Sequence, residues 1–279
     1  MKNDLNLGNR FEFGRNWGRF LKVLDETRIF EAEKSLKKTL EIEYLNEKRF
    51  LDIGSGSGLI SLAAKRLGAI VHSFDSDPLS VACTEELKRR YFQGDPLWTI
   101  EQGDVLNTSY LKSLGQFDVV YSWGVLHHTG AMWRALGNVT PLVNGGGKLF
   151  ISIYNDQGAS SLRWANLKKF YNHSSQPIRL ITILGVGGYW EFRSALIRVM
   201  RCKNPLPFRD WAMKKRDRGM SVWHDLVDWA GGYPFEVAKP EEIFDFCWKK
   251  GFQLVKLKTC GGGIGCNEFV FTREGRSIT

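Results

Sequence analysis

The sequence has few cysteines and no stretch that is long and apolar enough to cross a bilayer. Five cysteines in 279 residues, odd in number and without a CxxC pair, exclude a small disulfide scaffold and indicate reduced thiols. The first residues, 1–4, are polar and lack the apolar core of a signal peptide. The longest nearly uncharged apolar segment, 177–190, is interrupted by Arg179 and three glycines. We therefore expect a cytoplasmic protein without a membrane-spanning helix.

Histidine is scarce as well, while tryptophan and positive charge are abundant. The five histidines form no cluster with Cys or Asp at ligand spacing, so we expect no metal. The sequence contains 10 Trp, and 39 basic residues outnumber 30 acidic ones, for a net charge of +9. Large rings often line ligand pockets. A basic balance is compatible with nucleic acid, an anionic small molecule or a membrane surface, and does not choose among them.

Short apolar segments alternate with helical patterns between residues 50 and 154. Strands are predicted at 50–53, 70–74, 98–100, 117–121 and 148–153, and helices at 59–67, 78–92 and 131–143. Strands separated by helices form a parallel sheet with helices on both faces. A helix that starts at Pro240 and two closing strands, 252–258 and 268–272, follow later. We expect an α/β fold with seven mostly parallel strands and an antiparallel last pair.

The strongest local signal is the segment 51–58, Leu-Asp-Ile-Gly-Ser-Gly-Ser-Gly, between the first strand and the first helix. A glycine-rich turn lets a ligand approach the backbone closely. Asp52 is a poor neighbour for a pyrophosphate and a good one for a cationic ligand. Asp75 ends the second strand, where a carboxylate can accept both hydroxyls of a ribose. Asp104 follows the third strand, where it could bind an exocyclic amine of adenine.

This pattern resembles a known enzyme family. Segments 50–76 and 102–105 resemble the first motifs of class I S-adenosylmethionine-dependent methyltransferases, and 121–128 with 142–153 resemble the later ones. The nearest subgroup includes the ubiquinone-biosynthesis-type O-methyltransferases. The resemblance covers roughly 49–154, extends to 239–272 by pattern, and leaves out 155–238. It implies a Rossmann-like fold, S-adenosyl-L-methionine as methyl donor and S-adenosyl-L-homocysteine as product.

The resemblance also implies roles for single residues. Asp52 would lie near the amino group of the cofactor, Asp75 would bind the ribose hydroxyls, and Trp123 would contact the methionine part and the acceptor. The loop around the methionine and the ribose would consist of Gly54, Ser55, Gly56 and Gly58. The residues bordering the adenine would be Ser76, Asp104 and Val105.

Four segments follow from these patterns. They are an N-terminal helical and aromatic accessory segment (1–45), the cofactor-binding Rossmann-like core (46–154), a basic, aromatic helical insertion after strand five (155–238), and a C-terminal helix with the last two strands (239–279). An insertion at the carboxyl edge of such a sheet favours a substrate lid over a purely structural layer. The accessory segment either folds over the ligand or packs on the sheet.

Three histidines are candidate general bases for a hydroxyl acceptor, because imidazole has a suitable pKa. His224 ranks first, since a base in the insertion would join the site only on closure. His128 and then His127 follow; they succeed the fourth strand, and such a pair often fixes the loop in the family. The alternative for each is a packing or surface role. The candidate substrate contacts are Trp223, Tyr233 and Glu236. The alternative for the segment 231–236 is a connector back to the core.

The acceptor is predicted from charge and from a missing motif. The fourth strand ends in Ser-Trp-Gly-Val and not in the Asn/Asp-Pro-Pro-aromatic motif of enzymes that methylate amino groups of bases. The insertion carries 13 Lys and Arg against 7 Asp and Glu. We expect O-methylation of a small anionic or hydroxylated acceptor, and we disfavour nucleic acid. A tRNA methyltransferase, a non-catalytic cofactor-binding regulatory protein and a peripheral contact with a membrane remain alternatives.

Overall fold

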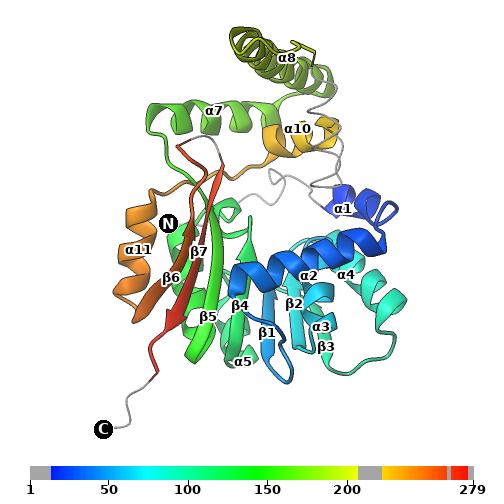
Figure 1. Ribbon diagram of the computed structural model, residues 1–279, viewed down its shortest axis with the longest axis vertical. Coiled ribbons are helices and arrows are strands. Elements are labelled where there is room, and N and C mark those ends of the chain that lie inside the picture. The colour runs from blue at the N-terminus through cyan, green and yellow to red at the C-terminus, as the bar shows by residue number, and fades with distance from the viewer. Residues whose placement is uncertain (1–13, 207–221, 263–264, 276–279) are drawn as a thin grey trace. The chain divides into compact units, whose positions relative to one another are not determined.

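The computed structural model describes residues 14–206, 222–262 and 265–275 (Figure 1). The strands are β1 (Arg49–Ile53), β2 (Ile70–Asp75), β3 (Trp98–Gln102), β4 (Phe117–Trp123), β5 (Val143–Tyr154), β6 (Phe252–Lys258) and β7 (Cys266–Arg273). The α-helices are α1 (Gly14–Phe20), α2 (Glu26–Leu40), α3 (Leu59–Arg66), α4 (Pro78–Tyr91), α5 (Thr108–Leu114), α6 (Met132–Val139), α7 (Ala159–His173), α8 (Gln176–Met200), α10 (Val222–Gly231) and α11 (Pro240–Trp248). Short 3-10 turns lie at η2 (Leu126–His128) and η3 (Thr140–Leu142). The chain folds as two compact units, which are described separately: 12–161 with 235–279, and 162–234.

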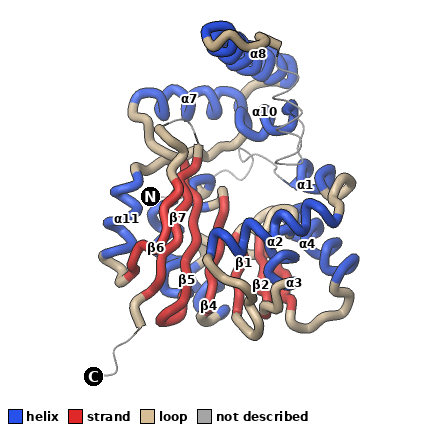
Figure 2. The backbone as a smooth tube through the Cα atoms, in the orientation of Figure 1, coloured by secondary structure: helices blue, strands red, loops and turns tan. Residues whose placement is uncertain are grey.

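The larger unit contains a single seven-stranded sheet in the order β3-β2-β1-β4-β5-β7-β6 (Figure 2). Strands β1 to β5 pair in parallel, whereas β7 runs antiparallel to both β5 and β6. This arrangement confirms the predicted α/β fold with seven mostly parallel strands. The order reverses between β1 and β4, and ligands of open α/β sheets bind beyond the carboxyl ends of strands at such a point.

Helices cover both faces of this sheet with separate apolar cores. On one face α2, α3 and α4 bury side chains such as Leu36, Leu62 and Leu87 against Phe50 and its neighbours. On the other face, buried residues of α5, α6 and α11 pack against the sheet. A sheet buried on both faces explains why its central strands are nearly continuous apolar segments in the sequence.

Local sequence signals set the starts of the helices. Pro78 opens α4, and the Asp77 side chain accepts a hydrogen bond from the backbone N–H of Leu79 at 2.9 Å. Asn107 caps α5 in the same way by accepting from the N–H of Tyr110. Helix α5 is not among the predicted helices, because its seven residues are too few to show a helical period.

A second difference concerns the three glycines at 145–147. The sequence predicts a turn there, but these residues lie inside β5. The pairing of β4 with β5 steps from Phe117–Val143 to Val119–Lys148, so the glycines form a bulge opposite Asp118. Glycine is suited to this bulge, since Gly146 has a φ of 77°. The edge strand β6 also carries an irregularity, between Leu254 and Lys256.

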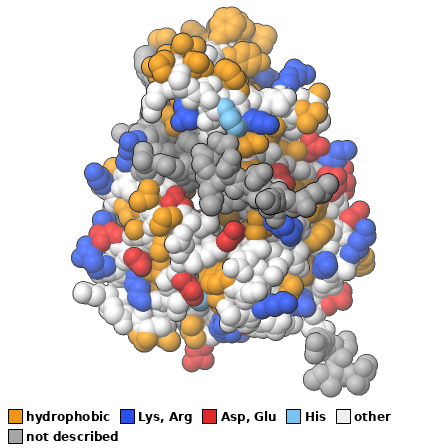
Figure 3. All heavy atoms as spheres, turned by 180° about the vertical axis from the view of Figure 1, so that it is seen from behind, with side chains coloured by type: hydrophobic (Ala, Val, Ile, Leu, Met, Phe, Trp, Pro, Cys, Tyr) orange, Lys and Arg blue, Asp and Glu red, His pale blue; other side chains and the backbone are white. Residues whose placement is uncertain are grey.

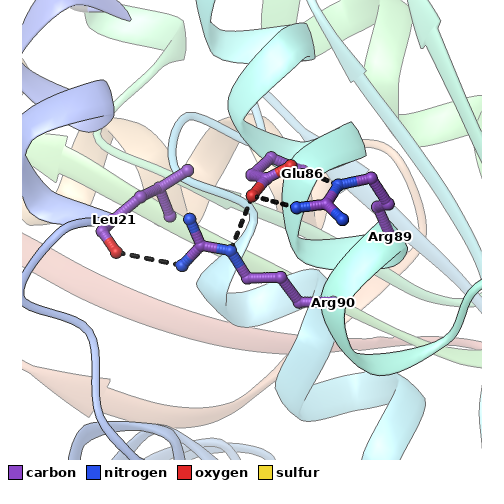
Figure 4. A network of polar contacts seen from close by, with 4 residues as sticks. All are labelled: Leu21, Glu86, Arg89 and Arg90. Atoms are coloured by element: carbon purple, nitrogen blue, oxygen red, sulfur yellow. Dashed lines mark hydrogen bonds and ion pairs between the residues drawn. The ribbon is translucent and has the colours of Figure 1, made fainter.

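The chain that follows α1 is attached to α4 by an exposed ionic network (Figure 4). Glu86 accepts from the guanidinium groups of Arg89 and Arg90 at 2.7 Å, and Arg90 donates to the carbonyl oxygen of Leu21 at 3.1 Å. Hydrogen bonds from Arg89 and then Arg90 lower the pKa of Glu86 to about 2. At the other end of α1, the N–H of Gly14 donates to the Asp77 carboxylate at 2.8 Å. Helix α1 is therefore held along α4.

The smaller unit, 162–234, is helical in its described part and has a small core. Tyr171, Ile183 and Ala230 form this core, flanked by Trp229. The Trp229 ring lies 4.2 Å from that of Trp164 and packs over the ammonium of the buried Lys168, which donates to the Trp229 carbonyl. This cation–aromatic cluster joins α7 to α10.

Candidate functional site

The sheet registers bring the predicted site residues to one edge. Asp52 is aligned with Ser73 on β2 and with Tyr121 on β4, while Asp75 is aligned with Gln102 on β3. The loops that follow β1, β2, β3 and β4 therefore leave the sheet side by side. A backbone hydrogen bond joins the loop after β1 to β2, since the N–H of Gly54 donates to the Phe74 carbonyl at 2.8 Å.

The glycine loop after β1 is built so that side chains are excluded from it. Gly54, Gly56 and Gly58 have φ values of 72°, 56° and 79°, in the left-handed region that favours glycine. A Cβ at Gly54 would lie 2.3 Å from a methyl group of Val125, and one at Gly58 would lie 2.8 Å from the Cα of Thr84. Glycine at these positions therefore permits a backbone conformation and a packing that a side chain would prevent, and contact of this loop with a ligand stays a prediction.

The Asp75 carboxylate connects the end of β2 to this loop. One oxygen accepts from the N–H of Gly56 at 3.0 Å, and the other accepts from the N–H of Asp77 at 2.9 Å. Burial raises the pKa of Asp75, and these backbone hydrogen bonds act in the opposite direction. Each carboxylate oxygen has a second lone pair, so Asp75 can still accept from two hydroxyl groups.

Asp52 lies beneath the loop at the start of a buried polar chain. It accepts from the Ser61 hydroxyl at 2.5 Å; Ser61 is bonded to Ser73, which accepts from the Trp98 indole at 3.0 Å. Burial raises the pKa of Asp52 to about 7, the Ser61 bond lowers it, and the charge of Asp75 raises it. A cationic ligand near these two carboxylates would favour their ionised forms.

The remaining predicted cofactor contacts lie on the neighbouring loops. Asp104 is exposed, and its carboxylate accepts from the N–H of Leu106 at 2.9 Å. Val105 is buried, whereas Ser76 is exposed and its carbonyl accepts from the Gln102 amide. Ser55, on the glycine loop itself, is buried and shares a 3.0 Å hydrogen bond with Thr84.

An aromatic cluster surrounds the turn after β4. His127 is buried, with its ring centre 4.1 Å from that of Tyr154 and 4.5 Å from that of His128, which is only half-buried. Trp123 is nearly half exposed at the end of β4, and its indole N–H approaches the Glu268 carboxylate at 3.5 Å. The half-buried His128 is the more accessible of the two histidines.

Glu236 holds this turn in place. Its two carboxylate oxygens accept from the N–H of Met132 at 3.1 and 3.0 Å, and its own N–H donates to the His127 carbonyl at 3.0 Å. Burial raises the pKa of Glu236, which the hydrogen bonds from Met132 and Gly130 offset in part. The sequence suggests a substrate contact at Glu236, and the structure shows its carboxylate engaged with the loop backbone.

The other predicted residues fall in the smaller unit. Trp223 and His224 belong to the first turn of α10, and their side chains lie outside the described part of the chain. Tyr233 is partly buried in the connection after α10. The structure therefore brings His127 and His128 to the sheet edge. The roles of Trp223, His224 and Tyr233 stay predictions.

Three residues outside the predicted set also shape this edge. Trp17 of α1 covers the glycine loop, since a Cβ on Gly56 would lie 3.0 Å from its indole nitrogen. Ser61 and Thr84 hold Asp52 and Ser55 from within the helices α3 and α4. The aromatic run at 11–17 was a signal for Trp17, but a small polar residue in a helix gives no comparable signal.

These features fit S-adenosylmethionine. Asp75 can receive a pair of hydroxyls, and the buried Asp52 and the partly buried Asp75, both with raised pKa values, suit a ligand that carries positive charge. Within residues 14–206, 222–262 and 265–275, no group of three or more His, Cys, Asp or Glu side chains could hold a metal ion.

Comparison with known proteins agrees with this geometry. Residues 51–149 match the family model described as "Methyltransferase domain". A ubiquinone biosynthesis O-methyltransferase of Aeromonas salmonicida is 34% identical over 110 residues, which is 39% of this chain and 44% of that protein. A ribosomal protein L11 methyltransferase of Prochlorococcus marinus is 43% identical over 84 residues, 29% of this chain and 27% of that protein. The chain thus spans less than half the length of these relatives.

Solved structures share the fold at low sequence identity. Magnesium protoporphyrin IX methyltransferase from Synechocystis PCC 6803, with bound SAH, aligns over 88% of this chain and 83% of its own with a TM-score of 0.52 and 14% identity. PKMT2 from Rickettsia typhi, in complex with AdoHcy, aligns over 89% and 54% with a TM-score of 0.56 and 11% identity. The family match includes the glycine loop, Asp75 and the strands between them, so residues 51–149 are similar to a methyltransferase domain, and the fold is shared with methyltransferases of known structure.

Proposed function

We propose that this protein transfers a methyl group from S-adenosylmethionine to an oxygen atom of a small anionic or hydroxylated acceptor. The proposal rests on the arrangement of one sheet edge: Asp52 lies beneath the glycine loop, Asp75 at the end of β2 accepts from the N–H of Gly56, and His128 follows β4. A cofactor site and a group able to take a proton thus lie on adjacent loops.

The protein need not activate the methyl group, because the cofactor supplies it already activated on a sulfonium. The glycine loop and Asp75 fix the donor, and the acceptor oxygen must be aligned with the methyl group. A hydroxyl acceptor also loses its proton during transfer, and the base must lie within hydrogen-bond reach of it. His128 takes this role among the histidines of the larger unit, while the packed His127 positions the turn. His224 remains the candidate in the insertion.

The charge of the insertion supports an anionic acceptor. Residues 155–238 carry 13 basic and 7 acidic side chains, and Arg163, Lys169 and Arg193 are among the cations of the described part. The relatives are named for ubiquinone biosynthesis and for ribosomal protein L11, two different contexts, so the proposed acceptor class rests on this charge. In the same proposal, 155–238 is the segment that selects the acceptor.

A screen for methyl transfer tests the function directly. The protein is incubated with radiolabelled S-adenosylmethionine and separate metabolite, tRNA and membrane fractions, and both label and S-adenosylhomocysteine are measured. Label in a small hydroxylated or anionic metabolite supports the proposal. Label in tRNA, with binding that weakens steeply as salt rises, would replace it by an RNA methyltransferase. Cofactor binding without any product would indicate a regulatory protein.

Single histidine variants test the base. Replacing the base by Ala should cut turnover about 10²–10⁴-fold while cofactor affinity changes little. His128→Ala, His127→Ala and His224→Ala are compared with His72→Ala, a β2 histidine that pairs with Glu101 at 2.8 Å and serves as control. Near-normal turnover in the first three variants would show that alignment alone drives the reaction.

A further inference from the structure

Helix α8 (Gln176–Met200) presents large apolar side chains to solvent. Only Ile183 and Val186 are buried along its 25 residues. Most of its other large apolar residues are exposed, with fractions that reach 68% at Ile181, 66% at Phe192 and 76% at Met200. Figure 3 shows the corresponding hydrophobic side chains gathered over α8 at the top of the view. Soluble proteins rarely leave so continuous an apolar surface uncovered.

The exposed residues share one face of the helix. At 100° per residue, one broad stripe opposite Ile183 and Val186 contains Ile178, Ile181, Leu184, Tyr189, Phe192, Leu196 and Val199. We call this stripe the α8 apolar face. The charged residues of α8 lie outside the stripe, and the helix is about 37 Å long at 1.5 Å per residue.

Positive charge outweighs negative charge in the segment that carries the α8 apolar face. Residues 162–206 contain eight Lys and Arg but only one acid, Glu191. That acid already faces Arg198 at 3.7 Å. Arg193 lies at one margin of the face, and Arg201 and Lys203 follow the end of α8. A partner that matches both the apolar face and these cations has an apolar interior and a negatively charged boundary.

We propose that α8 docks in the plane of an anionic lipid bilayer, with its apolar face among the acyl chains and its flanking cations at the head groups. The charge favours this occupant over a second copy of the chain, because a symmetric contact through α8 would bring two cationic margins together. Across the described residues, no helix is long and apolar enough to cross a membrane, so α8 lies on the bilayer. The proposal is independent of methyl transfer.

Vesicle co-sedimentation of the full-length protein tests the proposal without cofactor or acceptor. Vesicles of phosphatidylcholine with 30% phosphatidylglycerol are compared with vesicles of phosphatidylcholine alone. We expect binding to the first that weakens with salt, and roughly tenfold weaker binding to the second. Phe192→Ser should weaken binding to the anionic vesicles about tenfold, since it removes one large inserted side chain.

A matched variant separates this effect from general surface hydrophobicity. Phe30 on α2 is 60% exposed, close to the value for Phe192, but it belongs to the larger unit. Phe30→Ser should leave vesicle binding unchanged, and circular dichroism should show that both variants are folded. Equal loss in both variants, or equal binding to the two vesicle types, would overturn the proposal. So would sedimentation velocity showing a dimer that Phe192→Ser dissociates, because the face would then be a contact between copies.

Discussion

The two units use apolar residues in opposite ways. In the larger unit, helices on both faces of the sheet bury their apolar sides, and residues such as Leu36, Leu62 and Leu136 are almost inaccessible. In the smaller unit, the described core consists of Tyr171, Ile183 and Ala230, and most large apolar residues of α8 face outward. The apolar residues that recur at helical spacing are therefore buried in the larger unit, whereas those of α8 in the smaller unit form an exposed face.

The comparison teaches that apolar content alone does not locate a core. Burial of apolar area stabilises a fold by roughly 25 cal/mol per Å², but exposed apolar area contributes nothing until a partner covers it. The larger unit places the predicted cofactor-binding residues at one edge of its sheet. The smaller unit has an exposed face that suits recognition of something outside the chain.

The largest effect is expected from removing the smaller unit. Residues 162–234 are replaced by a flexible Gly-Ser linker, which keeps Glu236 and its bonds to the turn after β4. Cofactor binding should persist, because the glycine loop and Asp75 belong to the larger unit, whereas methyl transfer should be lost. Calorimetry and the transfer assay measure the two properties. Transfer at the normal rate would show that 155–238 is not a substrate lid.

Two leucine truncations compare burial directly. Leu149 in β5 is fully buried, so Leu149→Ala should lower the free energy of unfolding by about 2–5 kcal/mol. Leu184 on α8 is more than half exposed, so Leu184→Ala should change it by no more than about 0.5 kcal/mol. Denaturant unfolding measures both. Similar losses would mean that the α8 apolar face is covered within the protein.

Two glycines with the same φ of 72° test the loop. Gly54→Ala meets both backbone strain and Val125 at 2.3 Å, so we expect about 2–4 kcal/mol of lost stability and weaker cofactor binding. Gly124→Ala meets no atom within 4 Å and should cost only the strain, about 1–2 kcal/mol. Equal losses would mean that Val125 moves aside without cost.

Two carboxylates at opposite ends of the sheet test the ribose site. Asp75→Asn should weaken S-adenosylmethionine binding by about 1–3 kcal/mol, roughly 5- to 150-fold, since a charged acceptor is lost. Asp118 also accepts a backbone hydrogen bond, from the N–H of Arg49 at 2.8 Å, but it lies at the start of β4. Asp118→Asn should leave affinity unchanged by calorimetry. Unchanged affinity in Asp75→Asn would remove Asp75 from the cofactor site.

The smallest expected effect is a pH dependence of stability from Asp52. Its pKa is about 7 when folded and about 3.8 when unfolded, so the folded state binds the proton more tightly. The stability contributed by this group is present below about pH 4 and is lost as pH rises towards 7 and beyond. Between pH 6 and 7.5 the loss is about 1 kcal/mol. Asp52→Asn should lack it, and parallel pH profiles for the two proteins would contradict this account.

The order of strands and helices could be predicted from the sequence, with two instructive exceptions. The alternation of apolar strands and helices around the glycine loop gave the seven-stranded sheet, because burial on both faces produces continuous apolar segments. The predicted turn at 145–147 is a bulge within β5. Glycines permit either a turn or a bulge, and the pairing of β5 with β4 determines which of the two forms. Helix α5 is too short to be recognised by its period.

Some residues of the candidate site could also be predicted from the sequence, and others could not. Asp52 lies near the end of β1, Asp75 is the last residue of β2, and the glycines follow β1 directly, so their places at this edge could be predicted from the strands. The role of Glu236 depends on a hydrogen bond to Met132, 104 residues away in the chain. No local pattern reveals such a contact. The preference between His127 and His128 likewise depends on packing against Tyr154.

The free edge of the sheet also affects how the protein behaves at high concentration. Strand β6 ends the sheet beside β7, and an open strand edge can pair with the same edge of another molecule. The irregularity at Leu254–Lys256 and the charged Lys256 and Lys258 interrupt this edge. Lys256 is further bound to Glu41 at 2.9 Å. These lysines act as gatekeepers against fibrillar stacking, and replacing both with valine would turn β6 into a template for aggregation.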